Sequence, residues 1–158
     1  MILKIRTEGD PVLRQKAAPV RTIDDRMRQL AADMLETMYA APGVGLAAPQ
    51  IGESLRLVVL DDGDGPQILF NPVVVQARGH VDDDEGCLSV PKMVGTVSRA
   101  TDVVVTAQDR RGVPIRVLGT GFLAKILQHE IDHLDGVLYI DKASNVRPVQ
   151  DDADEEEC

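Results

Sequence analysis

The order of the apolar patterns along the chain limits its fold more than any other feature of the sequence. A stretch with helical spacing comes first, several short β-rich segments follow one another, and a second helical stretch comes after them. Strands that are grouped in this way, rather than alternating with helices, are typical of α+β proteins. We therefore expect mostly antiparallel strands packed around the second helix, with the first helix as an amphipathic N-terminal element.

The first helix is predicted between Thr22 and Ala41. Thr22 lies three residues before Asp25, a combination that is typical of a helix N-terminus, and Pro42 and Gly43 follow the expected end. Apolar residues recur in between with the spacing of one buried helix face, at Ile23, Met27, Leu30, Ala31, Met34, Leu35 and Met38.

The β-rich part of the chain contains four predicted strands. Their aliphatic and β-branched residues favour extended backbone, and they occupy residues 55–60, 68–76, 103–108 and 115–118. Residues 61–66 and 109–112 have the composition of turns. The glycine-rich segment 43–50 is unsuited to a helix, yet it is too apolar for an ordinary loop. The second helix is predicted at residues 120–134, where Gly136 stops it.

The charge of the chain is concentrated at one end. Six of the nine excess negative charges lie in residues 151–158, so the body is close to neutral and offers no basic surface for nucleic acid. A chain of 158 residues fits one domain. We expect a catalytic domain at residues 1–145 and a disordered acidic tail at residues 146–158.

The N-terminal segment and the cysteines indicate a reducing compartment. No apolar run is long enough for a secretory leader or a membrane helix, which favours the cytoplasm. Only two cysteines occur, Cys87 and Cys158, and we expect no disulfide between them. Cys158 ends the acidic tail and is expected to be an exposed thiol.

The second predicted helix contains the string His-Glu-Ile-Asp-His, from His129 to His133. Histidines four residues apart lie on one helix face, so both imidazoles can reach one metal ion. Glu130 is then close enough to a water molecule at that ion to carry protons in a hydrolysis. Such strings also arise by chance on solvated helices, but the chain has only three histidines and two of them form this pair.

A catalytic metal site of this kind needs a third protein ligand and an open position. The candidates are His80, a carboxylate and Cys87. A lone cysteine is most often a small buried apolar residue, but Cys87 follows a glycine, which lets its backbone approach another element closely. A thiolate with two imidazoles suits iron(II), zinc, cobalt or nickel. His80 precedes a run of aspartates and is expected at the surface.

Three segments together resemble the signature motifs of the peptide deformylase family, and the resemblance extends over residues 3–142. They are residues 43–50 (GVGLAAPQ), 85–89 (EGCLS) and 128–136 (QHEIDHLDG). The resemblance implies a metal-dependent amidohydrolase that removes the N-formyl group from the N-terminal formylmethionine of new polypeptides and releases formate. It also implies one divalent ion, natively Fe2+, with Zn2+, Ni2+ or Co2+ as replacements.

The resemblance also implies roles for individual residues. Cys87, His129 and His133 match the metal ligands, and Glu130 matches the general acid and base. The Gln50 side chain and the Leu88 backbone N–H match the donors that stabilise the oxyanion, a type of contact with a large effect on rate.

Further residues match the substrate-binding positions of the family. The backbone of Gly45 is expected to pair with the extended peptide as an added strand. Val44 and Ile126 are expected to line an apolar pocket for the methionine side chain. Arg99 lies where the family often has a basic residue, and we expect it to pair with Glu85 and orient the cysteine loop.

The chain departs from the best-known bacterial branch of the family at its C-terminus. That branch has a basic C-terminal helix linked to ribosome docking, whereas this chain ends in an acidic segment that would be repelled by ribosomal phosphate. We therefore expect formylmethionyl nascent peptides as substrates without docking by this route, in a bacterial cytoplasm or an organelle. Lys92 and Lys125 lie near the expected cleft and are hypothesised to favour acidic residues after methionine.

These residues allow three other interpretations. A zinc peptidase explains the histidines and Glu130 but leaves Cys87 and Gln50 without a role. A non-catalytic relative could bind formylated peptides or store metal, although every catalytic position is present. Cys87 could also be a redox thiol, which alkylation without loss of metal would support.

Overall fold

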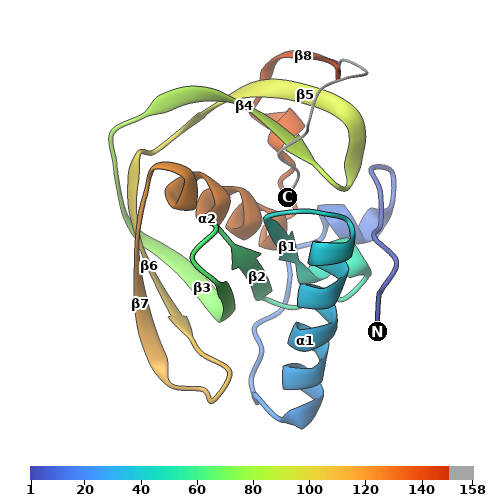
Figure 1. Cartoon of the computed structure of the whole chain (residues 1–158), viewed down its shortest axis with the longest axis vertical. Coiled ribbons are helices and arrows are strands. Elements are labelled where there is room, and N and C mark those ends of the chain that lie inside the picture. Colours follow the sequence, from blue (N-terminus) through green and yellow to red (C-terminus); the bar gives the residue numbers. More distant parts are fainter. Residues whose placement is uncertain (150–158) are drawn as a thin grey trace.

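The computed structural model describes residues 1–149 and has the expected α+β fold, with mostly antiparallel strands. Within these residues, eight strands form two sheets, and two α-helices pack with them. Three short 3-10 helices complete the order, at Pro11–Arg14, Ala48–Ile51 and Tyr139–Asp141. Helix α2 (Gly121–Leu134) lies in the middle of the molecule and contacts strands of both sheets (Figure 1).

The larger sheet has five strands in the order β1-β2-β3-β6-β7, and all of its pairings are antiparallel. It contains every strand that the sequence predicts, although β3 is longer than expected, because residues 66–67 pair with β2 and residues 77–78 pair with β6. Its strands are β1 (Gly45–Ala47), β2 (Leu57–Asp61), β3 (Pro66–Arg78), β6 (Asp102–Gln108) and β7 (Pro114–Thr120). β1 lies at one edge, so part of the 43–50 segment is an edge strand next to α2.

The smaller sheet was not predicted from the sequence. It has the order β4-β5-β8 and consists of β4 (Val81–Cys87), β5 (Val90–Arg99) and β8 (Ser144–Pro148). β4 begins with three consecutive exposed aspartates after Val81, and aspartate is rare in strands. Backbone pairing with β5 nevertheless keeps these residues extended.

The expected boundary between the catalytic domain and the acidic tail, at residues 145 and 146, falls within the third strand of the smaller sheet. Residues 146–148 belong to β8, where Arg147 pairs with Val94 and Pro148 with Met93. The composition of these residues does not indicate a strand, but their pairing with the edge of β5 keeps them extended. From residue 150 onward, the expected tail, with Cys158, lies outside the described residues.

Helix α1 (Asp25–Ala40) has the predicted buried face but a different cap. The carboxylate of Asp24 accepts a hydrogen bond of 3.1 Å from the Met27 backbone N–H, so Asp24 is the N-cap and Thr22 is an exposed residue before the helix. The buried residues Met27, Ala31, Met34 and Met38 form one cluster with β2. The same cluster includes Ala48 and Ile51, so α1 packs against the 3-10 helix between β1 and β2.

Candidate metal centre

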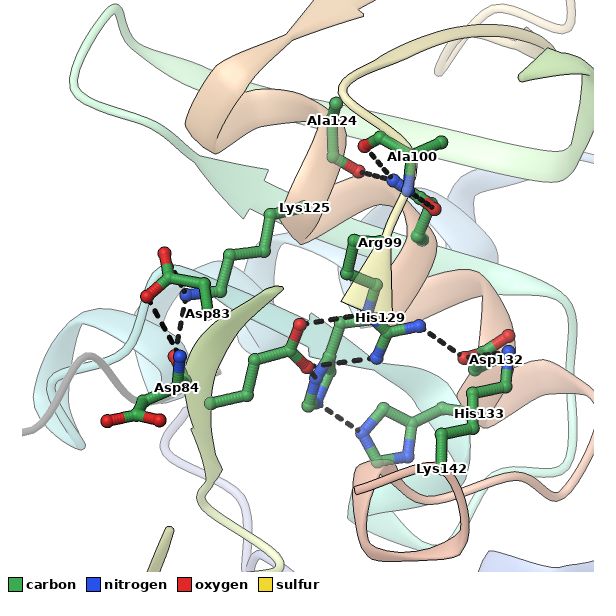
Figure 2. A network of polar contacts seen from close by, with 12 residues as sticks. Asp83, Asp84, Arg99, Ala100, Ala124, Lys125, His129, Asp132, His133 and Lys142 are labelled. Atoms are coloured by element: carbon green, nitrogen blue, oxygen red, sulfur yellow. Dashed lines mark hydrogen bonds and ion pairs between the residues drawn. The ribbon is translucent and has the colours of Figure 1, made fainter. Parts of the chain in front are cut away.

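Cys87, His129 and His133 converge in the protein interior. The two histidines lie one turn apart on α2, and Cys87 ends β4, so the pairing of β4 with β5 brings the thiol over the helix. All three side chains are buried, and their ligand atoms lie within 4.8 Å of one another. Figure 2 shows the two imidazoles next to each other, with a dashed line between their ring nitrogens. His80 is exposed, as expected, and is not in this group.

The spacing of these donors fits a metal ion. Nε2 of His133 lies 3.2 Å from Nε2 of His129 and 3.4 Å from Sγ of Cys87. Bonds of about 2.0–2.1 Å to nitrogen and about 2.3 Å to sulfur place neighbouring ligands of a tetrahedral ion about 3.3–3.6 Å apart. One sulfur and two imidazole nitrogens therefore fit a divalent transition metal and leave a coordination position open.

Glu85 fixes the orientation of His129. Its Oε1 lies 2.8 Å from His129 Nδ1, and its carboxylate accepts two hydrogen bonds from Arg99, of 2.8 Å from Nε and 2.9 Å from Nη2. The expected pairing of Arg99 with Glu85 is thus confirmed. Because an ionised carboxylate only accepts hydrogen bonds, His129 carries its hydrogen on Nδ1 and directs Nε2 toward Cys87 and His133.

The charges around His129 favour a cation. Burial alone would raise the pKa of Glu85, but hydrogen bonds from Arg99 and His129 outweigh it and lower this pKa to about 2. Burial alone would lower the pKa of His129, but Cys87, Glu85 and Glu130 raise it to about 10. The negative groups around His129 thus favour positive charge at this position, and a bound divalent ion would supply that charge in place of the proton.

A further set of contacts, which was not predicted, ties β5 to α2. Nη1 of Arg99 donates to Asp132 Oδ2 at 2.7 Å, and Lys142 Nζ lies 3.0 Å from the same oxygen (Figure 2). Arg99 therefore bridges Glu85, two residues before Cys87, and Asp132, one residue before His133. The sequence could not indicate this bridge because it depends on how β5 lies across the helix.

Glu130 is fully buried next to His129, and Gly45 leaves the space that it occupies. A Cβ atom built on Gly45 would lie 2.6 Å from Glu130 Oε2 and 2.9 Å from its Cδ, which is closer than real Cβ atoms come. β1 thus passes directly over the carboxylate. Residues 43–50 and the helical motif at residues 128–136 therefore lie against each other here.

Gln50 is buried with its amide in a defined orientation. Its Oε1 accepts a hydrogen bond of 2.9 Å from the Ala47 backbone N–H, and its Nε2 lies 3.1 Å from Ser89 Oγ and 3.6 Å from Cys87 Sγ. The amide N–H groups are therefore directed toward the cysteine. Leu88, between Cys87 and Ser89, is half-buried, and its side chain packs with the α1 cluster. The contact with Ser89 was not predicted.

Val44 and Ile126 line a small pocket that reaches His129. The pocket, with its open mouth, has a volume of about 260 Å³, and its other lining residues are Glu85, Gly86, Phe122, Lys125 and His129. Phe122 and Lys125 were not assigned to it from the sequence. Their spacing from Ile126 and His129 places all four on one face of α2, so the helical period was the signal that could have found them.

The comparisons with known proteins agree with this arrangement. The family model described as Polypeptide deformylase matches residues 2–149, which include the whole metal centre. The chain belongs to the polypeptide deformylase family. A peptide deformylase of Symbiobacterium thermophilum is 55% identical over 99% of this chain and 73% of its own length, and one of Pelotomaculum thermopropionicum is 51% identical over 92% and 94%.

Solved structures of deformylases share the fold. The peptide deformylase of Legionella pneumophila is 49% identical, with a TM-score of 0.88 over 92% of this chain and 88% of that one. The enzyme from Thermotoga maritima is 41% identical, with a TM-score of 0.89 over 91% and 99% of the two chains.

Membership of the deformylase family establishes the reaction. The chain is a hydrolase that removes the N-formyl group from the N-terminal formylmethionine of nascent peptides, in a family that uses a metal. Neither helix of the described part has the length and apolar character that crossing a membrane requires.

Proposed function

We propose that this deformylase hydrolyses the formamide at an ion held by Cys87, His129 and His133. The observation that carries the proposal is the convergence of these three ligand atoms within 4.8 Å, beside the buried carboxylate of Glu130. A bound divalent ion would acidify a water molecule and polarise the formyl carbonyl. Fe2+ is the proposed native ion, and Zn2+, Ni2+ or Co2+ suit the same ligands.

Glu130 is the proposed general base and acid. Its carboxylate takes a proton from the attacking water, whose oxygen forms a bond to the formyl carbon. The same carboxyl group then gives the proton to the amide nitrogen as the C–N bond breaks, so that formate and a free amine leave. Its burial and its place next to His129 support this role.

Gln50 and Leu88 are the proposed oxyanion donors. The carbonyl oxygen becomes negative during the attack, and donors that are already oriented stabilise it without further rearrangement. The hydrogen bond from Ala47 to Gln50 Oε1 and the contact of Gln50 Nε2 with Ser89 hold the amide with its N–H groups toward the metal centre. The Leu88 backbone N–H follows Cys87 directly and is proposed to donate beside it.

The peptide is proposed to bind along β1, with its methionine side chain in the pocket of Val44 and Ile126. β1 is an edge strand, and Gly45 within it has no side chain to obstruct an added strand. His129 is one of the residues that line the pocket, so a side chain held there places the preceding formyl group near the candidate metal centre.

The proposed setting is a bacterial cytoplasm or an organelle, with formylmethionyl nascent chains as substrates and no direct binding to membranes or nucleic acid. The described residues after Asp141 form β8 rather than a helix. We therefore propose that the enzyme meets nascent chains without ribosome docking through a basic C-terminal helix. The domain is proposed to end with β8, before the acidic tail.

Replacement of Glu130 by glutamine tests the proposed chemistry. The variant keeps the size of the side chain but cannot accept the proton, so formate release from formyl-Met-Ala-Ser should fall about 10²–10⁴-fold. Its metal content should stay at the wild-type value, because Glu130 is not a proposed ligand.

Glu36→Gln, at an exposed glutamate of α1, is the matched control and should keep wild-type turnover. Full activity of Glu130→Gln at normal metal content would contradict the proposal. It would then favour a role for Glu130 in packing alone.

A further inference from the structure

The methionine pocket lies between α2 and β4. Phe122, Lys125, Ile126 and His129 form its helical wall, and Glu85 and Gly86 belong to its strand wall. A helix rises about 1.5 Å per residue, so Lys125 lies about 6 Å along α2 from His129. That distance is close to the reach of an extended methionine side chain, which places Lys125 beside the end of the pocket that is farther from His129, here called the outer end.

Lys125 crosses from the helical wall to the strand wall. Its Nζ donates to the backbone oxygen of Asp84 at 2.7 Å and lies 3.4 Å from Asp83 Oδ2 (Figure 2). The Lys125 side chain is only 17% exposed, although it ends in a charge, because its stem lies along the pocket. The main contact is to backbone, so it fixes the position of the strand itself.

The two walls are therefore joined at both ends of the pocket. At the inner end, Glu85 contacts His129, and Arg99 ties β5 to Asp132 on α2. At the outer end, the side chain of Asp84 forms hydrogen bonds with the neighbouring strands, through Thr96 and Arg147. Among the contacts described for residues 83 and 84, those of Lys125 alone reach the helix.

We propose that Lys125 is a specificity-determining residue that holds β4 against α2 and thereby sets the width of the pocket for an unbranched side chain. The inference rests on the proposed binding of methionine in this pocket. It also revises the hypothesis that Lys125 attracts acidic residues after methionine, because its ammonium group already contacts Asp84 and Asp83 on β4.

The variant Lys125→Met tests this role, since it keeps the stem and removes the group that reaches β4. The values of kcat/KM are measured for formyl-Met-Ala-Ser and formyl-Phe-Ala-Ser. We expect the preference for methionine over phenylalanine to fall about 5–10-fold, in the range that a change of pocket fit produces. Hydrogen exchange at residues 83–86 should become faster than in the wild type.

Two further variants complete the experiment. Lys125→Arg retains a donor that can reach β4 and should keep most of the preference. Lys16→Met removes an exposed lysine that is outside the pocket and should leave both the preference and the exchange unchanged.

A Lys125→Met preference within about twofold of the wild type would overturn the inference, even if both rates fell together. Failure of the proposed function is a separate result, because the wild type would then release no formate from formyl-Met-Ala-Ser.

Discussion

At Gly45 the backbone passes so close to Glu130 that no side chain fits between them. An added Cβ would approach three atoms of the Glu130 side chain at 2.6–2.9 Å, and Glu130 is fully buried. The sequence motif suggests that Gly45 serves the substrate through its backbone. The structure adds a second reason for glycine here, which is the space that the carboxylate needs to lie beside the metal centre.

The variant Gly45→Ala should therefore act through Glu130. We expect kcat to fall about 100-fold at unchanged metal content, because a displaced carboxylate transfers protons poorly. Glu130→Asp shortens the same side chain and relieves the clash. The double variant should consequently lose less activity than the product of the two single losses, measured as kcat/KM. Losses that multiply would show that Gly45 serves the substrate backbone alone.

The metal pair could be predicted from residues, whereas its surroundings could not. His129 and His133 are related by the fixed geometry of a helix, so their spacing alone predicts a shared ion. The third ligand could not be predicted in this way, because the distance between β4 and α2 is a tertiary property; His80 and a carboxylate were also candidates, and the resemblance to the family indicated Cys87. The contact of Ser89 with Gln50 depends on the same packing and has no local signal.

At the level of elements, the β4–β5 hairpin and α2 form one unit that carries the three proposed metal ligands. β5 supplies Arg99, whose guanidinium joins Glu85 on β4 to Asp132 on α2. The cost of removing these charged groups from water is offset because each of them is paired. Burial alone would lower the pKa of Arg99, but Glu85 and Asp132 raise it. Local propensity missed β4 because its exposed aspartates have no apolar alternation, although tertiary pairing determines their conformation.

The variant Arg99→Lys tests this unit. Lysine keeps the charge but lacks the planar fork that contacts both oxygens of Glu85, so His129 should be held less firmly. We expect the affinity for Zn2+ to fall about 10–100-fold, as measured by competition with a chelator.

Arg147→Lys is the matched control, because Arg147 contacts Asp84 on the exposed side of β4. Its affinity for Zn2+ should match that of the wild type. An equal loss in both variants would show that the general stability of the sheet, rather than the orientation of His129, supports the site.

At the scale of the whole molecule, the N-terminal segment contacts the C-terminal end of α2. The backbone oxygen of Leu134 accepts hydrogen bonds from Ala17 N at 2.8 Å and Arg56 Nη1 at 3.0 Å. Gly136 then ends the helix with a φ of +76°, close to the backbone of Arg14.

The α+β class and both helices could be predicted because their patterns are local. The second sheet could not, because β8 is ordered only by its pairing with β5.

The central claim is that Cys87, His129 and His133 bind one catalytic ion. The most direct test is anaerobic purification with metal analysis, coupled to a formate-release assay on formyl-Met-Ala-Ser. We expect one divalent ion per chain and rapid formate release in the wild type. Both should be lost in Cys87→Ala, whose single change removes one of three ligands. Absence of formate after loading with iron, nickel or zinc, or full metal content in Cys87→Ala, would contradict the account.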